Sequence, residues 1–285
     1  MTRWIMGLTM LGCVAAAWPA GAQQRMPIYD THAHYSMPAW NEFGVEAIFH
    51  KFDEAGVVRA LVSSSPDDGT LKLYERDKQR VVPILRPYRD DIGPSNWFRD
   101  AAVLKYLADR LRMKVHRGIG ELHLFNADDV TSLLVRETAA LASAQNLPMH
   151  VHAGAAPIEA LFRVRPEIHI LWGHAGLGES AETIDAMLNK YPNLNAELAL
   201  RAGDIAPGGT VDPAWRDMLI RHKTRFMIGT DTWVTSRWSY YPEIAQQRPR
   251  KSLSTQKTAL WMPSWICSNH MHQITTTSSL IRHRP

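Results

Sequence analysis

Cysteine is nearly absent from this chain, which has two cysteines among 285 residues. Cys13 lies in a segment that we predict to be removed, and Cys267 lies near the C-terminus. The mature chain therefore cannot form an intramolecular disulfide, and its stability must come from an apolar core. Any metal site must use nitrogen and oxygen ligands, for which the 13 histidines are a rich source.

Long hydrophobic runs are missing as well. The N-terminal apolar run, residues 4–17, is too short to span a bilayer comfortably. It follows Arg3, ends before Pro19 and is followed by the small-residue sequence AGA. This pattern is typical of a secretory signal peptide, residues 1–22, cleaved after Ala22. We therefore expect a periplasmic or secreted protein with no stable membrane association after cleavage.

Acidic residues are missing from the C-terminal end of the chain, where the last one is Glu243. Residues 1–243 hold all 28 acidic residues and 26 of the 32 basic ones, so this body has a net charge of −2. Because phosphate binding relies on basic side chains, the charge disfavours a nucleic-acid partner. We expect a small-molecule substrate, and the sequence leaves a homo-oligomer open.

Residues 244–285 differ from the rest of the chain. Pro249 and Pro263 interrupt them, Ser and Thr are frequent, and the apolar residues follow no sustained period. This composition is typical of a disordered or frameshifted segment. We predict that this basic tail replaces the last helix of the fold.

Two common catalytic motifs are also absent. The sequence has no Gly-x-Ser-x-Gly nucleophile elbow, which disfavours a serine hydrolase of the open-sheet type. No glycine-rich phosphate loop follows the first predicted strand, which disfavours a dinucleotide-binding fold.

Apolar runs of strand length alternate with helical periodicity along the body, which predicts an α/β fold with a parallel sheet. Eight such units within about 205 residues predict a (β/α)8 TIM barrel over residues 27–243, with an open doubly wound sheet as the alternative. The predicted strands are 27–31, 57–64, 81–87, 118–125, 148–153, 168–175, 193–200 and 226–231.

Polar residues gather at the ends of these runs, where a barrel of this kind carries its functional groups. His32 and His34 lie two residues apart on the first strand, so both can reach one ion. Later strands end with further candidates, namely Arg86, Glu121, His123, His152, His174, Arg201 and Asp231. Imidazole and carboxylate ligands without thiolate suit Zn²⁺, Mn²⁺ or Fe²⁺, which activate water and polarise carbonyl groups.

The motifs YDTHAHY, GIGELHL, MHVHAG, ILWGHAGL and MIGTDTW resemble the amidohydrolase superfamily of metal-dependent barrels over residues 27–243. They look most like the branch that includes small-acid hydrolases, lactonases and nonoxidative decarboxylases. The resemblance implies that His32, His34 and His152 are metal ligands. It also implies that Asp231 binds the metal and takes the proton from the attacking water.

Two roles stay open in this resemblance. Glu121 lies in GIGEL, which resembles a motif of the metal-dependent deoxyribonuclease branch, where a carboxylate bridges two metals. If Glu121 bridges, the site is binuclear and His174 is a ligand. If it does not, the other four ligands hold one ion, and His174 polarises substrate or water.

The candidate substrate-binding residues are Arg86, Arg201 and His123. The two arginines either clamp a substrate carboxylate or form ion pairs that close the barrel. Of the remaining polar residues, we expect Asp30 to support the site and His150 to belong to the core. His116 and His222 are predicted to be solvated.

The sequence thus predicts an exported metal-dependent hydrolase that cleaves an amide, ester or lactone with a metal-activated water. The substrate is expected to be small and to carry a carboxylate. The expected cofactor is one or two divalent ions, first Zn²⁺, with Mn²⁺ or Fe²⁺ as alternatives. A nonoxidative decarboxylase with the same ligands is the alternative function. A barrel that is inactive or only binds a ligand, because of the altered C-terminus, is the second alternative.

Overall fold

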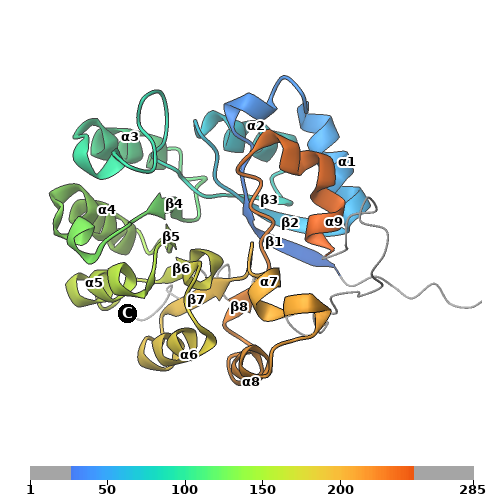
Figure 1. Cartoon of the computed structure of the whole chain (residues 1–285). Coiled ribbons are helices and arrows are strands. Elements are labelled where there is room, and N and C mark those ends of the chain that lie inside the picture. Colours follow the sequence, from blue (N-terminus) through green and yellow to red (C-terminus); the bar gives the residue numbers. More distant parts are fainter. Residues whose placement is uncertain (1–26, 247–285) are drawn as a thin grey trace, which may run out of the picture.

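Figure 1 shows the computed structural model, which describes residues 27–246. The predicted signal peptide and residues 247–285 of the predicted tail lie outside the described residues. Within the described range, the helices are too short or too polar to cross a membrane.

Each predicted apolar run corresponds to one strand, and all the strand pairs are parallel. β1 extends two residues past its predicted run, and the other strands are shorter than their runs, since the ends of those runs turn into loops. They are β1 (Ile28–Ala33), β2 (Val57–Val62), β3 (Val81–Pro83), β4 (Ile119–His123), β5 (Met149–His152), β6 (Ile170–Trp172), β7 (Leu194–Glu197) and β8 (Phe226–Met227).

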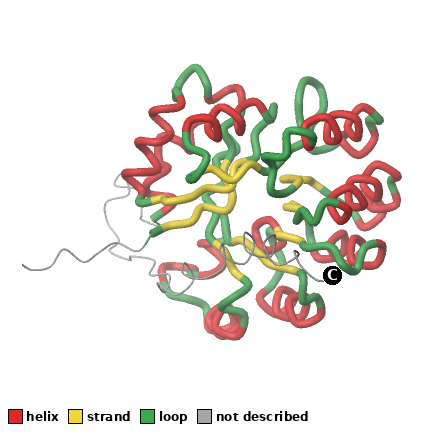
Figure 2. The backbone as a smooth tube through the Cα atoms, turned by 180° about the vertical axis from the view of Figure 1, so that it is seen from behind, coloured by secondary structure: helices red, strands yellow, loops and turns green. Residues whose placement is uncertain are grey.

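Helices follow the strands and lie outside them, as Figures 1 and 2 show. One helix follows each strand except β7, which two helices follow. They are α1 (Val45–Ala55), α2 (Asp68–Arg76), α3 (Ala102–Leu111), α4 (Leu133–Ala144), α5 (Ala155–Val164), α6 (Ala181–Lys190), α7 (Ala202–Ile205), α8 (Pro213–Arg221) and α9 (Tyr241–Ala245). This order confirms the predicted alternation of strands and helices.

The strands form a three-stranded sheet, β1-β2-β3, and a five-stranded sheet, β4 to β8 in order. Single bridges join the two sheets at both edges, between Leu85 and Ile119 and between Asp30 and Ile228. At the second edge the backbone N–H of Thr31 also donates to the carbonyl of Ile228 at 2.8 Å. The strands therefore follow one another around a ring, which is the arrangement of a (β/α)8 barrel.

Alternation along the strands separates an outer core from a barrel interior. On β2, Ala60 and Val62 pack in the same cluster as the buried face of α1. Leu61 points to the opposite side and belongs to a separate small cluster inside the ring. The other buried members of this inner cluster are Ile84, Leu171 and Met227. The pairing of β1 is irregular between Asp30 and Ala33, and His32 points into the barrel, where its ring lies beside those of His150 and His174.

The packed body continues past the predicted boundary at residue 243. After β8 the short helix α9 lies against α1. Gln246 then donates from its Nε2 to the carbonyls of Glu54 (3.0 Å) and Ala55 (2.9 Å). A short helix that ends at Ala245 therefore follows β8. Most of the tail 244–285, which we predicted to replace the eighth barrel helix, lies outside the described residues.

Tyr241 ties α9 to the barrel. Its hydroxyl donates to Oδ2 of Asp30 at 2.8 Å, and both side chains are fully buried. Since a hydrogen bond to a charged group contributes more than a neutral one, Tyr241→Phe should lower the free energy of unfolding by about 2 kcal/mol. Urea denaturation measures this, and Tyr74→Phe, at a half-buried position on α2, is the control. Equal stability of the two variants would contradict the packing of α9 described here.

Candidate metal centre

Six of the predicted polar residues meet at the carboxyl ends of the strands. We call them the cluster. They are His32 on β1, His34 directly after β1, Glu121 on β4, His152 on β5, His174 after β6 and Asp231 after β8. All except His152 are buried, and the side chain of His152 is 26% exposed. The barrel thus brings together the residues that the sequence motifs singled out.

The first half of the cluster consists of His32, His34 and Asp231. The Nε2 atoms of the two histidines lie 3.0 Å apart. Oδ1 of Asp231 lies 3.5 Å from Nε2 of His32 and 3.2 Å from Nε2 of His34. These three ligand atoms converge within 4.8 Å, a spacing that one metal ion can bridge.

The second half consists of Glu121, His152 and His174. Oε1 of Glu121 lies 2.9 Å from Nδ1 of His152 and 3.5 Å from Nε2 of His174. The ligand atoms of this half also lie within 4.8 Å of one another. The barrel mouth therefore holds two ligand sets side by side.

Glu121 faces both halves with different oxygens. While Oε1 points to the second half, Oε2 lies 3.4 Å from Nε2 of His32 and 3.3 Å from Nε2 of His34. A carboxylate placed in this way can bind two ions at once. Two-metal hydrolytic sites have ions roughly 3.5–4 Å apart, which such a bridge allows.

Hydrogen bonds fix the ring orientation of three cluster histidines, His32, His34 and His174. Each uses Nδ1–H as a donor to a buried acceptor. The acceptors are Oε1 of Glu197 (3.0 Å), the carbonyl of Ser63 and the carbonyl of Ala199 (3.1 Å), in that order. With Nδ1 protonated, the lone pair on Nε2 points into the cluster, as in metal-ligating histidines.

This donor set fits a divalent cation. The Nε2 atoms of His32 and His34 face each other at 3.0 Å, and the Glu121 and Asp231 carboxylates lie beside them. Burial lowers the pKa of His32, but the nearby carboxylates outweigh it and raise that pKa well above its usual value. The pKa of Asp231 is lowered in return by the histidines, against the effect of burial. The cluster thus attracts positive charge, and its nitrogen and oxygen donors suit Zn²⁺, Mn²⁺ or Fe²⁺.

Glu197 is a site residue that the sequence analysis missed. It is fully buried at the end of β7, accepts from Nδ1 of His32, and also accepts the backbone N–H groups of His174 and Ala199. Burial raises its pKa, but His32 and His174 lower it to about 2. Glu197 therefore stays charged and orients two cluster histidines.

The sequence held one signal for Glu197, which is the only charged residue in the apolar run NLNAELAL. The structure adds the close approach of Gly229 on the neighbouring segment, where a side chain would collide with Oε2 of Glu197 and Cβ of His32. Glycine is required there by this close approach.

Two cluster residues adopt left-handed backbone conformations. The φ angle is 55° at His174 and 50° at Asp231. Such angles are uncommon for residues other than glycine and persist only when surrounding contacts hold them. The N–H of Asp231 donates to the carbonyl of His32 at 2.6 Å. This bond fixes the Asp231 backbone beside the first half of the cluster.

Arg201 holds the turn that carries His174. Its Nη1 donates to the carbonyls of His174 and Ala175, both at 3.2 Å, and its Nη2 donates to that of Glu179 at 2.6 Å. Nε forms an ion pair with Asp204 at 2.8 Å. These contacts match the second role predicted for Arg201, an ion pair that stabilises the barrel, since all of them are made to the protein itself. The clamp on a substrate carboxylate stays a prediction.

We expect Arg201→Lys to weaken metal binding. A lysine cannot reach three carbonyls from a planar fork, so the His174 turn would relax. Loss of a supporting contact of this kind typically costs about 10- to 100-fold in metal affinity. Competition with a chelator measures the affinity, and Arg216→Lys at an exposed position on α8 is the matched control. Unchanged affinity in Arg201→Lys would remove the positioning role.

Arg86 and His123 lie beside the cluster. Nη2 of Arg86 donates to Oε2 of Glu121 at 2.9 Å, and its guanidinium lies 4.5 Å from the Tyr88 ring centroid. The Tyr88 hydroxyl is hydrogen-bonded to Nδ1 of His123 at 2.9 Å, and the His123 ring stacks on His152 at 4.3 Å. Burial lowers the pKa of His123 to about 3. The predicted substrate contacts of Arg86 and His123 remain predictions.

The structure places the supporting residues as follows. Asp30 is buried beside β8, where its carboxylate accepts from Thr230, and His150 lies behind His32 with ring centroids 4.4 Å apart.

The prediction that His116 and His222 are solvated is wrong. Nε2 of His116 lies 3.0 Å from Oδ2 of Asp67, and Nε2 of His222 lies 2.8 Å from Oδ1 of Asp185. Both rings are buried against these carboxylates.

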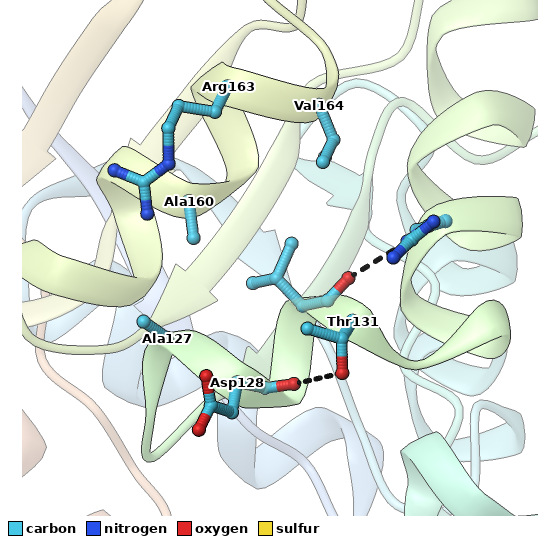
Figure 3. Close-up of a pocket in the computed structure, with 8 residues that line it drawn as sticks. Ala127, Asp128, Thr131, Ala160, Arg163 and Val164 are labelled. Carbon is cyan, nitrogen blue, oxygen red and sulfur yellow. Dashed lines mark hydrogen bonds between the residues drawn. The ribbon is translucent and has the colours of Figure 1, made fainter.

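A hollow of about 200 Å³ lies away from the cluster, on the outer side of the barrel (Figure 3). It lies between α5 and the short helix at Ala127–Thr131. Its polar groups bond locally: the Thr131 hydroxyl donates to the Asp128 carbonyl at 2.7 Å. None of the cluster residues lines it, so it is separate from the metal centre.

No family model matches the sequence, and no curated protein matches it. Solved structures do match. A TatD homologue from Escherichia coli K12 is 17% identical, with a TM-score of 0.52, and the match covers 77% of this chain and 93% of that one. A protein assigned as a 2-pyrone-4,6-dicarboxylic acid hydrolase, from Pseudomonas putida, is 16% identical, with a TM-score of 0.52 over 78% of this chain and 89% of that one.

An amidohydrolase from Burkholderia multivorans also matches, with 16% identity and a TM-score of 0.47, over 84% of this chain and 98% of that one. The two structures with TM-scores of 0.52 share the fold of this chain. Together with the ring of parallel strands, they bear out the resemblance seen in the motifs. The described chain has the (β/α)8 barrel fold of these two structures.

Proposed function

We propose that this protein is a metal-dependent hydrolase that holds two divalent ions and cleaves an amide, ester or lactone bond in a small molecule. The position of Glu121 carries the proposal. Its two oxygens face two separate ligand sets, each of which contributes further nitrogen or oxygen donors. A binuclear centre uses all six cluster residues, whereas a single ion would leave part of the set unused.

When bound, the ions would lower the pKa of a water molecule and polarise the scissile carbonyl. The chain supplies the proton transfer. Asp231 lies at the mouth of the barrel with one oxygen at the first ligand set and the other 4.0 Å from Nε2 of His174. It can accept the proton of the attacking water and pass it to the leaving group. His152 is the exposed member of the cluster, so substrate reaches the site on its side.

A substrate carboxylate is not part of this proposal. It rested on Arg86 and Arg201, and both guanidinium groups contact the protein itself. We do propose export, which the N-terminal pattern supports. The mass of the mature protein recovered from the periplasm or medium would test the cleavage after Ala22.

The first experiment is the metal content of the mature full chain, purified without a His-tag, by elemental mass spectrometry. We expect about two transition-metal ions per chain, as a two-metal site requires. Hydrolysis of esters and lactones should stop with a chelator and resume with Zn²⁺ or Mn²⁺. A ratio near zero that does not rise on adding metal would sink the proposal. Release of CO₂ from an aromatic acid, without any hydrolysis, would favour the decarboxylase alternative.

A further inference from the structure

Large apolar side chains are exposed on the loops around the cluster. Those that follow β1, β4, β6, β7 and β8 form what we call the apolar rim: Met37, Phe125, Leu177, Leu200 and Trp233, which are 44–61% exposed. Three of them, Met37, Leu177 and Trp233, come two or three residues after a cluster residue. Single exposed apolar residues are ordinary, but a set at one end of a barrel marks a binding surface.

A row of rings connects this rim to the cluster. The Phe125 ring lies 6.1 Å from the His123 ring, which in turn stacks on His152 with 4.3 Å between centroids. His152 contacts Glu121 at 2.9 Å. The two hydrogen bonds between His123 and the Tyr88 hydroxyl, at 2.8 and 2.9 Å, fix the middle ring of the row. One wall of the entrance is therefore built of planar side chains, which favour flat ring ligands in offset stacking.

Positive charge is scarce around the same entrance. The loops at 34–44, 63–67, 124–132, 153–154 and 173–180, which follow β1, β2, β4, β5 and β6, contain no lysine or arginine. The loops after β3 and β8 hold Arg89, Arg99 and Arg237. Arg89 and Arg237 donate to backbone carbonyls, and the Arg99 guanidinium lies over the Phe98 ring. Arg86 is paired with Glu121, and Arg201 is 1% exposed beneath the His174 turn. An anionic end group on the substrate would therefore lie among apolar side chains and carboxylates. Burial of a charge without a partner is costly.

We propose that the substrate of the hydrolase carries an uncharged aromatic acyl group, which lies along Phe125 and His123 while the scissile carbonyl reaches the cluster. This inference rests on the proposed function and adds the class of substrate to it. The apolar rim then excludes water around the acyl group. The exposed location of Phe125 and Trp233 makes both available to a ligand without a change in the core.

Binding of two hydroxamic acids tests this without turnover. Benzohydroxamic acid and its 4-carboxy derivative share the metal-binding group and differ only by a charge at the far end. Calorimetry on the full chain loaded with Zn²⁺ should show benzohydroxamic acid binding at least about 10-fold more tightly, because the charged ring finds no partner. Phe125→Ala should weaken its binding by about 3- to 10-fold through loss of ring contact. Ile220→Ala, an exposed apolar position on α8, is the matched control and should change nothing.

The outcomes separate the two proposals. If the chain binds metal but prefers the 4-carboxy compound, or if Phe125→Ala behaves like Ile220→Ala, this inference is overturned and the metal centre stands. If the chain binds no metal, the proposed function fails and the inference falls with it. If the alanine variants change the oligomeric state and leave hydroxamate binding unaltered, the rim is a protein interface, which also overturns the inference.

Discussion

Asp231→Asn is expected to lower kcat by about 10²- to 10⁴-fold, the usual contribution of a general base. The asparagine amide cannot accept the proton of the attacking water. Its carbonyl oxygen can still take the place of Oδ1, which lies 3.2 Å from Nε2 of His34. Asparagine also tolerates the left-handed conformation at this position, where φ is 50°. The fold and most of the metal should therefore survive while turnover is lost.

The measurement combines steady-state kinetics on an activated ester with elemental analysis of the same sample. Asp217→Asn, at an exposed position on α8, is the control and should leave both readouts unchanged. Loss of metal together with activity would show that Asp231 acts mainly as a ligand. Turnover at the wild-type level would remove the proton-transfer role altogether.

The sequence predicted the barrel and the cluster for the same physical reason. In parallel strands that follow one another around a ring, the carboxyl ends meet at one mouth, so residues far apart in the chain become neighbours. His32 and Asp231 are therefore brought together by topology alone, once both strands are recognised. The period of two expected for an extended segment then predicts the shared direction of His32 and His34, although His34 directly follows the end of β1.

Strand boundaries explain why Glu197 was missed. The apolar run 193–200 suggested a strand that ends next to Arg201, whereas β7 ends at Glu197. Functional residues do occupy the strand ends, but the end of this strand was predicted three residues after its actual position at Glu197. Beyond β7, Leu200 has a left-handed backbone with φ of 66°, which redirects the chain before Arg201. Residue spacing contains no information about such a turn.

The burial of two isolated histidines was also not predicted from the sequence. His116 and His222 carry no local sign of burial, because their partners Asp67 and Asp185 are 49 and 37 residues away. A polar residue on a loop is usually solvated unless a tertiary contact satisfies it. Only the packing of distant segments decides such cases.

Glu121 offers the sharpest test of two ions against one. Glu121→Gln should reduce the metal content from about two ions to about one, because a neutral amide is a poor bridge between two cations. The first ligand set, His32, His34 and Asp231, does not depend on Glu121 and should keep its ion. The glutamine oxygen can still accept from Nη2 of Arg86, so the buried guanidinium keeps a partner and the fold persists.

Turnover in Glu121→Gln should fall by at least about 10²-fold, since a second ion normally helps to stabilise the charge of the reacting oxygens. Metal per chain and thermal melting are measured together, with Glu159→Gln, a surface position paired with Lys190, as the control. If the wild-type chain holds about one ion and Glu121→Gln still holds one, the carboxylate does not bridge. His32, His34, His152 and Asp231 would then hold a single ion, and His174 would act on the substrate or water from outside the ligand set.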